Sequence, residues 1–401
     1  MTYRAQGNLG LIAATLSSGI FGFFTFLGLI AALLVDLSKE FGTSVAVIGQ
    51  LTTITAVSWA VLAPLIGPWS DRIGHKRMLT VGLVIFGVSL IAYSASNSFW
   101  ALITSSILAG LGGAMMGPNV LACVADYYSA NTYGRGMATI NVASSLAYLV
   151  GVPAAVLIAG NLGWRWSFLS LAVFFLACFL AVVIVLPSSR SHQSDKSVTY
   201  VSRFSEALRE KTFLPMVIAN TVLQAAYWVV TTYLAAFLIR SYTLSTLQLA
   251  PLLSSIAVGH LAGAIAGGPL ADRLDRIKIC AVASVLLGMT GLAFILFTQN
   301  LWLSVFWGGL FMGFYGSSRP AYFSLMALVS TTVRGTVMGI QAVSNHLGRA
   351  LGAAIGGLVL SLTGYDFLGV LCLILSLVAS VMYVFLNFFM RKVPEGTANG
   401  L

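Results

Sequence analysis

Apolar residues fill this chain in long runs that are separated by short polar segments. Each run holds about 20 apolar positions or more, which is the length that crosses a hydrocarbon core about 30 Å thick as an α-helix. Lipid offers no hydrogen bonds to an open backbone, so runs of this kind form helices. The pattern predicts an all-α membrane protein with twelve transmembrane helices, at about residues 8–35, 46–68, 78–96, 99–127, 136–159, 165–187, 213–239, 246–270, 279–298, 301–328, 336–362 and 366–390.

Composition supports this assignment. Hydrophobic residues make up 58% of the chain and charged residues only 8%, whereas soluble domains carry about 25% charged residues. Lipid must therefore contact most of the surface. The net charge of +10 could suggest a nucleic-acid partner, but the basic residues lie in short loops between apolar runs, as membrane orientation alone requires. We expect no nucleic-acid binding.

A loop sequence occurs twice. Gly67-Pro68-Trp69-Ser70-Asp71-Arg72 returns as Gly268-Pro269-Leu270-Ala271-Asp272-Arg273, with the two aspartates 201 positions apart in 401 residues. Arg135-Gly136 and Arg334-Gly335 repeat in the same way. Internal duplication in a membrane protein is typical of transporters built from two halves. We predict two pseudo-symmetric six-helix bundles, residues 1–187 and 213–401 with a short cytoplasmic tail, joined by a polar cytoplasmic linker at 188–212.

Charge placement predicts the orientation. With both termini in the cytoplasm, sixteen of the 21 basic residues fall on the cytoplasmic side, and Lys39, Arg165 and Arg240 fall outside. Such a bias follows the rule that Lys and Arg are retained inside. The expected location is the inner or plasma membrane of the cell, with a multi-pass topology.

The first loop resembles the cytoplasmic signature of the major facilitator superfamily, and helix count, duplication and linker match that family over the whole chain. The resemblance implies a conformational latch in which Asp71 secures one state and a basic residue pairs with an acid at the inner end of the fourth helix. Asp126 fits that acid, and His75, Lys76 and Arg77 are its alternative partners. Gly67 is expected to let two helices approach closely. The expected latch residues are Gly67, Asp71, Arg72, Gly74, His75, Lys76, Arg77, Asp126, Asp272, Arg273, Arg135 and Arg334.

Departures from the family pattern limit what carries over. In the second copy Asp275 replaces the usual Gly, and no acid lies near Ala327, which occupies the position equivalent to Asp126. We therefore expect the second latch to be degenerate. Gly151-Val152-Pro153 is similar to the Gly-Pro motif of the drug and sugar exporter branch, although kinking and close packing alone would also use these residues. Ser106 stands where exporters tend to have Arg, which argues against standard proton-for-drug exchange.

Charged and titratable residues deep in the predicted spans point to the substrate. Counted at 1.5 Å per residue, Arg319, His346 and His260 lie about 18 Å from the cytoplasmic ends of their helices, and Arg349 lies slightly deeper. No Asp or Glu lies at comparable depth. Intramembrane charges are functional candidates by default, and a guanidinium binds carboxylate or phosphate in bidentate fashion. A negatively charged substrate explains the two arginines. The alternative is that Arg319 and Arg349 hydrogen-bond to backbone carbonyls or polar groups at helix breaks such as Gly316-Ser317-Ser318.

The two histidines are candidates for proton coupling, although packed neutral histidines would look the same in sequence. The expected binding residues are Arg319, Arg349, His346, Asn345, His260, Gln224, Tyr227, Trp228, Asn119 and Tyr148. The leading hypothesis is a monomeric secondary active transporter that moves a small organic solute, favoured as an organic anion, by alternating access, coupled to a proton or counter-ion. The alternative is a proton-coupled exporter of drugs or sugars. No nucleophile, metal-ligand cluster or phosphate loop is visible, so we expect no enzyme and no cofactor.

Overall fold

The computed structural model describes residues 9–128, 132–187, 212–329 and 334–392, which form helices and no strands. The α-helices are α1 (Leu9–Ala32), α2 (Leu34–Glu40), α3 (Val45–Ile73), α4 (His75–Ser94), α5 (Phe99–Tyr127), α6 (Tyr133–Leu146), α7 (Val152–Leu162), α8 (Trp164–Val185), α10 (Phe213–Tyr242), α11 (Thr246–Arg273), α12 (Arg276–Leu296), α13 (Leu301–Val329), α14 (Arg334–Thr363) and α15 (Asp366–Lys392). A π-helical segment, η1 (Ala147–Gly151), joins α6 to α7. The expected all-α architecture is confirmed.

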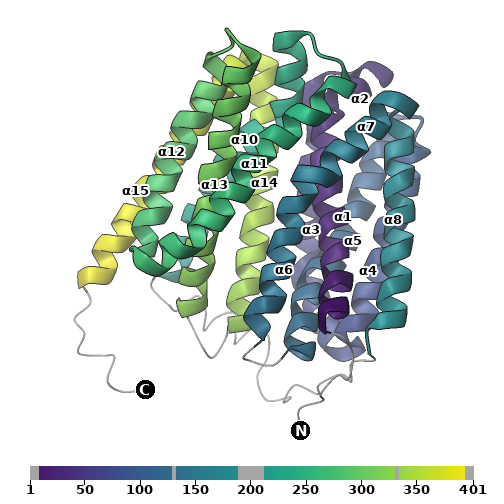
Figure 1. The fold of residues 1–401 in the computed structure, drawn as a ribbon, viewed down its shortest axis with the longest axis vertical. Coiled ribbons are helices and arrows are strands. Elements are labelled where there is room, and N and C mark those ends of the chain that lie inside the picture. The colour runs from purple at the N-terminus through teal and green to yellow at the C-terminus, as the bar shows by residue number, and fades with distance from the viewer. Residues whose placement is uncertain (1–8, 129–131, 188–211, 330–333, 393–401) are drawn as a thin grey trace.

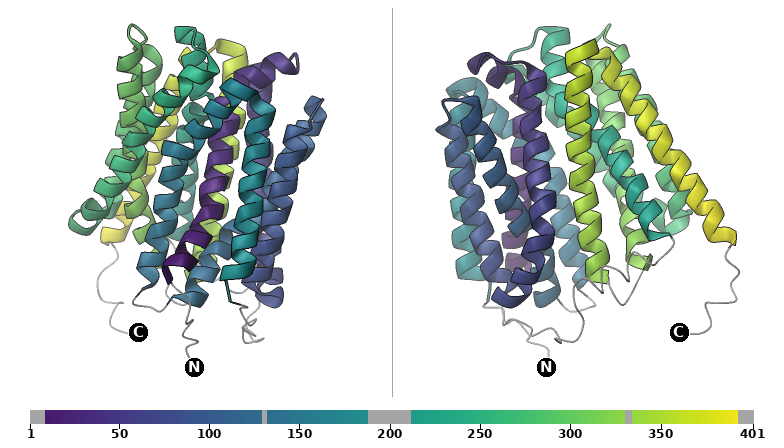
Figure 2. Two further views of the ribbon diagram at one scale, coloured as in Figure 1. Left: turned by 45° about the vertical axis from the view of Figure 1, so that its right-hand side comes forward. Right: turned by 180° about the vertical axis from the view of Figure 1, so that it is seen from behind.

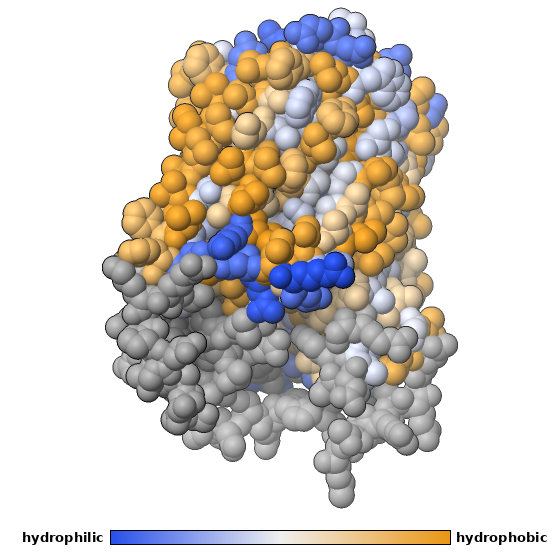
Figure 3. Space-filling view, turned by 60° about the vertical axis from the view of Figure 1, so that its left-hand side comes forward, coloured by the Kyte–Doolittle hydropathy of each residue, from blue (hydrophilic) through white to orange (hydrophobic). Residues whose placement is uncertain are grey.

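Eleven of these segments are long and apolar enough to cross a membrane, counting α6, η1 and α7 as one. The twelfth long helix, α13, is continuous, but glycines, serines, Arg319 and Pro320 interrupt its apolar sequence. Large apolar side chains point outward, such as Ile184 at 79% exposed and Trp100 at 75%. Figure 3 shows one such face, where apolar residues dominate and hydrophilic ones gather toward the two ends. Exposure of this kind fits lipid rather than water as the surrounding solvent.

The helices gather into an N-terminal group, α1 to α8, and a C-terminal group, α10 to α15 (Figures 1 and 2). The first residue of α1 and the last of α15 lie at the same end of the molecule, the lower end in Figure 1. Exposed basic residues near the helix termini lie at this end, including Arg72, Arg77 and Arg273. We call it the basic end and its opposite the far end.

The two groups are in close contact at the far end. A Cβ added to Gly49 of α3 would lie 2.4 Å from the Tyr233 hydroxyl of α10, and one on Gly357 of α14 would lie 2.3 Å from Gln50 of α3. Thr246 of α11 donates to Asp36 of α2 at 2.7 Å. Glycine allows such backbone approach because it has no side chain to clash.

Helices α3 and α14 are less closely packed toward the basic end. A Cβ on Gly67 of α3 or on Gly339 of α14 would meet nothing within 4 Å. The close helix approach expected at Gly67 is therefore not seen in this conformation. In this structure the two groups are thus packed together at the far end, whereas Gly67 and Gly339 toward the basic end make no such close contact.

This packing predicts a shift in conformation for Gly49→Val. The valine side chain would overlap Tyr233, which is fully buried and donates to the Ala353 carbonyl at 2.8 Å. The far end is therefore expected to open. The distance between spin labels on the exposed residues Leu162 and Leu247, measured by pulsed electron resonance, reports this change.

Gly67→Val is the matched control, because the same addition at Gly67 meets open space in this state. It is expected to leave the far-end distance unchanged or to sharpen its short component. A short, unchanged distance in Gly49→Val would contradict the packing described here.

The helix that carries Gly151 and Pro153 contains a π-helical bulge, and at Gly151 it packs closely against α1. Five residues adopt π-helical geometry just before Pro153, and a Cβ on Gly151 would lie 2.1 Å from Thr25 of α1. Pro153 has no N–H to donate to the Leu149 carbonyl four residues earlier. That carbonyl instead accepts from the Ser254 hydroxyl of α11 at 3.1 Å. The proline thus frees a backbone acceptor that ties the two helix groups together.

Candidate functional site

Arg349 lies in the middle of α14 and faces the other helix group. Its side chain is only 2% exposed. One terminal nitrogen contacts His346 Nδ1 at 2.9 Å, and Nε has no hydrogen-bond partner. A guanidinium carries five donors and remains charged. Among the described residues, the hydrogen-bond partner found for this guanidinium is His346.

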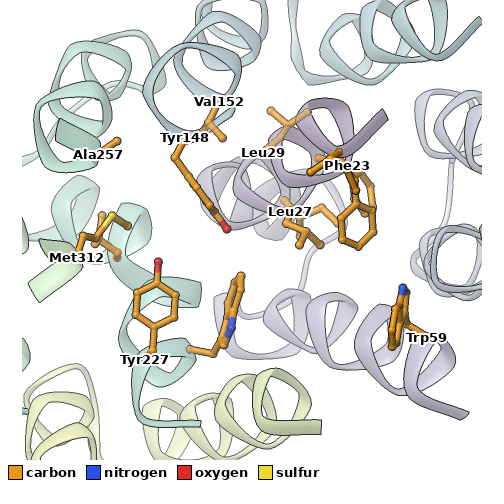
Figure 4. Packing of buried hydrophobic residues seen from close by; sticks show 14 of the residues in the cluster. Phe23, Leu27, Leu29, Trp59, Tyr148, Val152, Tyr227, Ala257 and Met312 are labelled. Atoms are coloured by element: carbon orange, nitrogen blue, oxygen red, sulfur yellow. The ribbon is translucent and has the colours of Figure 1, made fainter. Parts of the chain in front are cut away.

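Aromatic rings from both groups surround Arg349. The guanidinium carbon lies 6.0 Å from the ring centroid of Phe23 on α1 and 5.5 Å from that of Trp228 on α10. The His346 ring stacks on Trp59 of α3, with centroids 3.7 Å apart and planes 14° apart. Ring faces attract cations, but they neutralise no charge. Figure 4 shows Phe23 and Trp59 on neighbouring helices of the N-terminal group.

Arg319 of α13 lies beside a cluster of amides. Its guanidinium donates to Asn220 Oδ1 at 2.9 Å and to Asn345 Oδ1 at 3.4 Å. Gln224 Nε2 also donates to Asn345 Oδ1, at 2.9 Å. The alternative of hydrogen bonds to polar groups within the protein thus describes Arg319, although these groups are side-chain amides and not the backbone at Gly316-Ser317-Ser318. Arg319 is held by neutral side-chain oxygens.

A cluster of tyrosines begins beside Arg319, whose guanidinium carbon lies 5.5 Å from the ring centroid of Tyr315. Tyr315 of α13 donates to Gln224 Oε1 at 2.7 Å and stacks on Tyr227 of α10, with centroids 3.7 Å apart. Tyr148 of η1 approaches from the other group, and His260 of α11 lies between it and Tyr315, 5.9 Å from each ring. Figure 4 shows Tyr148 and Tyr227 projecting into the same region from opposite groups.

Neither deep arginine has a carboxylate partner among the described residues. The ion pairs found there join His75 to Asp126 and Arg165 to Glu40, near the two ends of the molecule. Burying a guanidinium without a counter-charge costs several kcal/mol. The centre of the molecule therefore holds uncompensated positive charge.

A small cavity of about 40 Å³ lies on the far side of these tyrosines. An engineered cavity that admits benzene measures about 150 Å³, so this one is too small for an organic solute. The hydroxyls of Thr231, which lines it, and of Tyr227 have no hydrogen-bond partner. The cavity is lined by Gly28, Ala31, Ala32, Tyr148, Val152, Thr231, Leu234, Ala235, Leu253, Ile256, Ala257 and Met312. Close packing thus closes the site toward the far end.

Most of the expected binding residues meet in this region, but Asn119 does not. Its side chain bonds to Ser70 of α3 and donates to the Met115 carbonyl, and it is 1% exposed. The structure adds Asn220, Tyr315, Phe23 and Trp59, which the sequence reasoning missed. Asn220 lies one helical turn before Gln224, and that polar spacing was the available signal.

The latch loop at the basic end is partly described. Gly74 ends α3 with φ of 100°, a conformation that glycine adopts without strain. His75 Nδ1 lies 2.8 Å from Asp126 Oδ2, whereas Lys76 donates to the Val183 and Leu186 carbonyls. Of the three expected partners of Asp126, His75 is therefore the one in contact, and this contact is an ion pair only when the imidazole is protonated.

The second copy of the loop is built differently. Asp275 caps α12 by accepting from the backbone N–H groups of Ile277 and Lys278. Asp272 and Arg273 are exposed. A helix cap replaces the turn that glycine makes in the first copy. The side chains of Asp71, Arg135 and Arg334 lie outside the described residues, so their expected roles remain predictions.

The described residues contain no group of three His, Cys, Asp or Glu that could hold a metal ion. The chemistry available at the centre of the molecule is that of guanidinium, amide, imidazole and phenol groups. These groups bind and orient a ligand through charge and hydrogen bonds. A nucleophile activated by a neighbouring base is not found among the residues of the cluster.

Comparison with known proteins agrees with this architecture. Multidrug resistance protein 2 of Bacillus subtilis is 27% identical over 366 residues, covering 88% of this chain and 90% of the relative. A crystal structure of a bacterial homologue of the human lysosomal transporter Spinster, inward-facing and unoccupied, has a TM-score of 0.72 at 17% identity and covers 95% of each chain. The human organic anion transporter MFSD10 (TETRAN) has a TM-score of 0.70 at 19% identity, covering 95% of this chain and 98% of the other.

The family model of the Major Facilitator Superfamily matches residues 15–259 and 216–400, which together take in nearly the whole chain. The two matched segments overlap at residues 216–259. With twelve long helices in two groups and a polar site between them, the chain belongs to the Major Facilitator Superfamily and is a membrane transporter rather than an enzyme.

Proposed function

We propose that this protein is a secondary active transporter of a small organic anion. The observation that carries the proposal is Arg349: a buried guanidinium with an unpartnered Nε and no carboxylate partner among the described residues. Such a group is stabilised when a carboxylate or phosphate enters and takes its free donors. The substrate thus supplies the charge that the site lacks.

The body of the substrate contacts the aromatic side chains around this charge. Phe23, Trp59 and Trp228 present ring surface beside Arg349 and His346. Arg319 and the amides of Asn220 and Asn345 offer polar contacts on the adjoining side. Sites of this kind, apolar with a few convergent polar groups, bind small organic molecules.

Transport proceeds by alternating access between the two helix groups. We assign the basic end to the cytoplasm from the placement of Lys and Arg, which makes the packed far end the outer side. The contacts at Gly49, Gly357 and Ser254 close the outer side. Rocking one group against the other would break them and close the basic end. A solved human organic anion transporter shares this fold.

A second candidate function is export of drugs. A relative named multidrug resistance protein 2 shares 27% identity with the chain, and the aromatic lining of the site would suit neutral or cationic ring compounds. Under this alternative, the two arginines would serve packing or gating, and protons would drive export by exchange.

A thermal-shift screen of the purified protein separates these functions, because a ligand that binds only the folded state raises its melting temperature. We expect stabilisation by members of a carboxylate and phosphate set, and none by sugars or cationic dyes. Stabilisation by cationic dyes alone would favour the exporter and would rule out the anion site.

A further inference from the structure

His346 is a titratable side chain at the centre of the molecule whose role anion binding alone does not explain. Its ring links the two helix groups, stacked on Trp59 of α3 while it belongs to α14. Its Nδ1 atom contacts the Arg349 guanidinium at 2.9 Å. The same ring therefore touches the proposed anion-binding group and the interface that opens and closes.

The Arg349 contact fixes the protonation state of His346 in this conformation. A guanidinium can only donate hydrogen bonds, and it stays charged. Nδ1 must therefore accept, so it carries a lone pair and no proton. Protonating Nδ1 would set an N–H group against the N–H groups of Arg349. A proton on His346 Nδ1 and the present hydrogen bond are mutually exclusive.

No acid faces this pair among the described residues. Phe23 of α1 and Trp59 of α3 bring no titratable group to the His346 ring. The titratable side chains that face Arg349 from other elements are the phenols of Tyr148 of η1 and Tyr315 of α13. The other deep cation and the other deep histidine lie next to Tyr315. The Arg319 guanidinium carbon is 5.5 Å from the Tyr315 ring centroid, and the His260 ring centroid is 5.9 Å from it. Within the described part of the chain, the positive charge in contact with His346 is thus that of Arg349.

We propose that His346 is a proton-binding site that is filled together with the anion site at Arg349. This inference rests on the proposed function. An anion that takes the Arg349 donors withdraws them from Nδ1 and adds a negative charge nearby. Nδ1 can then accept a proton from water, and the bound proton balances the charge of a monovalent anion. The imidazolium remains stacked on Trp59, where the indole face stabilises the new cation.

The two ligands therefore bind cooperatively, and by linkage each raises the affinity for the other. A carrier with this coupling moves proton and anion in the same direction. An exchanger that exports a cation requires the opposite relation, in which proton and substrate compete. The sign of the coupling thus separates the two candidate functions.

Proton uptake on ligand binding measures that sign. Benzenesulfonate is a suitable probe because a sulfonate stays ionised between about pH 5.5 and 8, the range in which histidine titrates. We titrate it into the purified protein in weak buffer with a pH indicator, and measure its dissociation constant across the same range. The expected result is uptake approaching one proton per anion, with a dissociation constant that falls by up to about tenfold per pH unit toward acid.

His346→Phe keeps an aromatic ring on Trp59 and removes the proton acceptor. It is expected to bind benzenesulfonate without proton uptake and without pH dependence. His346→Gln, which retains a hydrogen-bond acceptor for Arg349, is expected to behave in the same way and serves if the phenylalanine variant does not fold. His260→Phe, measured in parallel, separates the two deep histidines.

Several outcomes would overturn the proposal. Proton release on binding, uptake that persists in both His346 variants, or uptake lost only in His260→Phe would each exclude His346 as the coupled site. Absence of benzenesulfonate binding at every pH would contradict the anion site itself. Failure of the coupling and failure of the proposed function are thereby distinguished.

Discussion

Arg349→Met is expected to lose anion binding and anion transport while the protein remains folded and in the membrane. Removing one partner of a buried charged hydrogen bond costs about 2–5 kcal/mol in binding, roughly 30- to 4,000-fold in affinity. Arg349 has no carboxylate partner among the described residues, so its loss leaves no buried acid unpaired. The measurement is uptake of an organic anion into proteoliposomes, with the melting temperature of the purified protein.

The melting temperature distinguishes a binding arginine from a structural one. A buried cation without a counter-charge is costly, so methionine is expected to leave the melting temperature unchanged or to raise it. Arg349→Lys keeps the charge but not the planar fork, and is expected to recover only part of the affinity. Arg240→Met, an exposed arginine at the far end that lies over Tyr365, is the control. Full anion transport by Arg349→Met would rule the site out.

Asn345→Asp is expected to weaken anion binding, because the new carboxylate supplies a counter-charge from within the protein. Asn345 Oδ1 already lies 3.4 Å from the Arg319 guanidinium and accepts from Asn220 and Gln224. A carboxylate of the same shape would accept from the same donors, neutralise Arg319 and repel an incoming anion. Affinity for the anion is expected to fall at least tenfold, with a higher melting temperature, as measured by calorimetric titration.

Two further variants test whether charge is the cause. Asn345→Ser shortens the side chain without adding charge and is expected to weaken binding less. Asn161→Asp adds the same charge at an exposed position near the far end and is expected to change nothing. Equal losses in Asn345→Ser and Asn345→Asp would show that packing, not charge, accounts for the effect.

The sequence predicted the helices well because lipid imposes a simple rule. Apolar runs of spanning length must be helical, so every predicted span has a counterpart, and α5 has the predicted bounds of 99–127. The breaks inside and between spans were less visible. The π-helical segment before Pro153 and the short helix Leu34–Glu40 lie within or beside apolar runs, where hydropathy carries no information on helix geometry.

The site was only partly predictable, for a reason that lies in how helices face one another. In a helix that is apolar all round, the pattern does not show which face is turned inward. Asn119 was expected in the site but packs against Ser70. Trp59 and Phe23 reach Arg349 and His346 only because α3 and α1 meet α14 across the two groups. Such contacts between distant segments have no counterpart in local sequence.

The proposed anion-binding role depends on the sign of the charge that the centre of this molecule accepts. The most direct measurement is calorimetric titration of the purified protein with a panel in which each carbon skeleton is present as acid, amide and amine. Our account predicts that binding is confined to the acids, and that Arg349→Met abolishes it. Amides or amines that bind as tightly as the corresponding acids, or acids that bind Arg349→Met as well as the native protein, would contradict it.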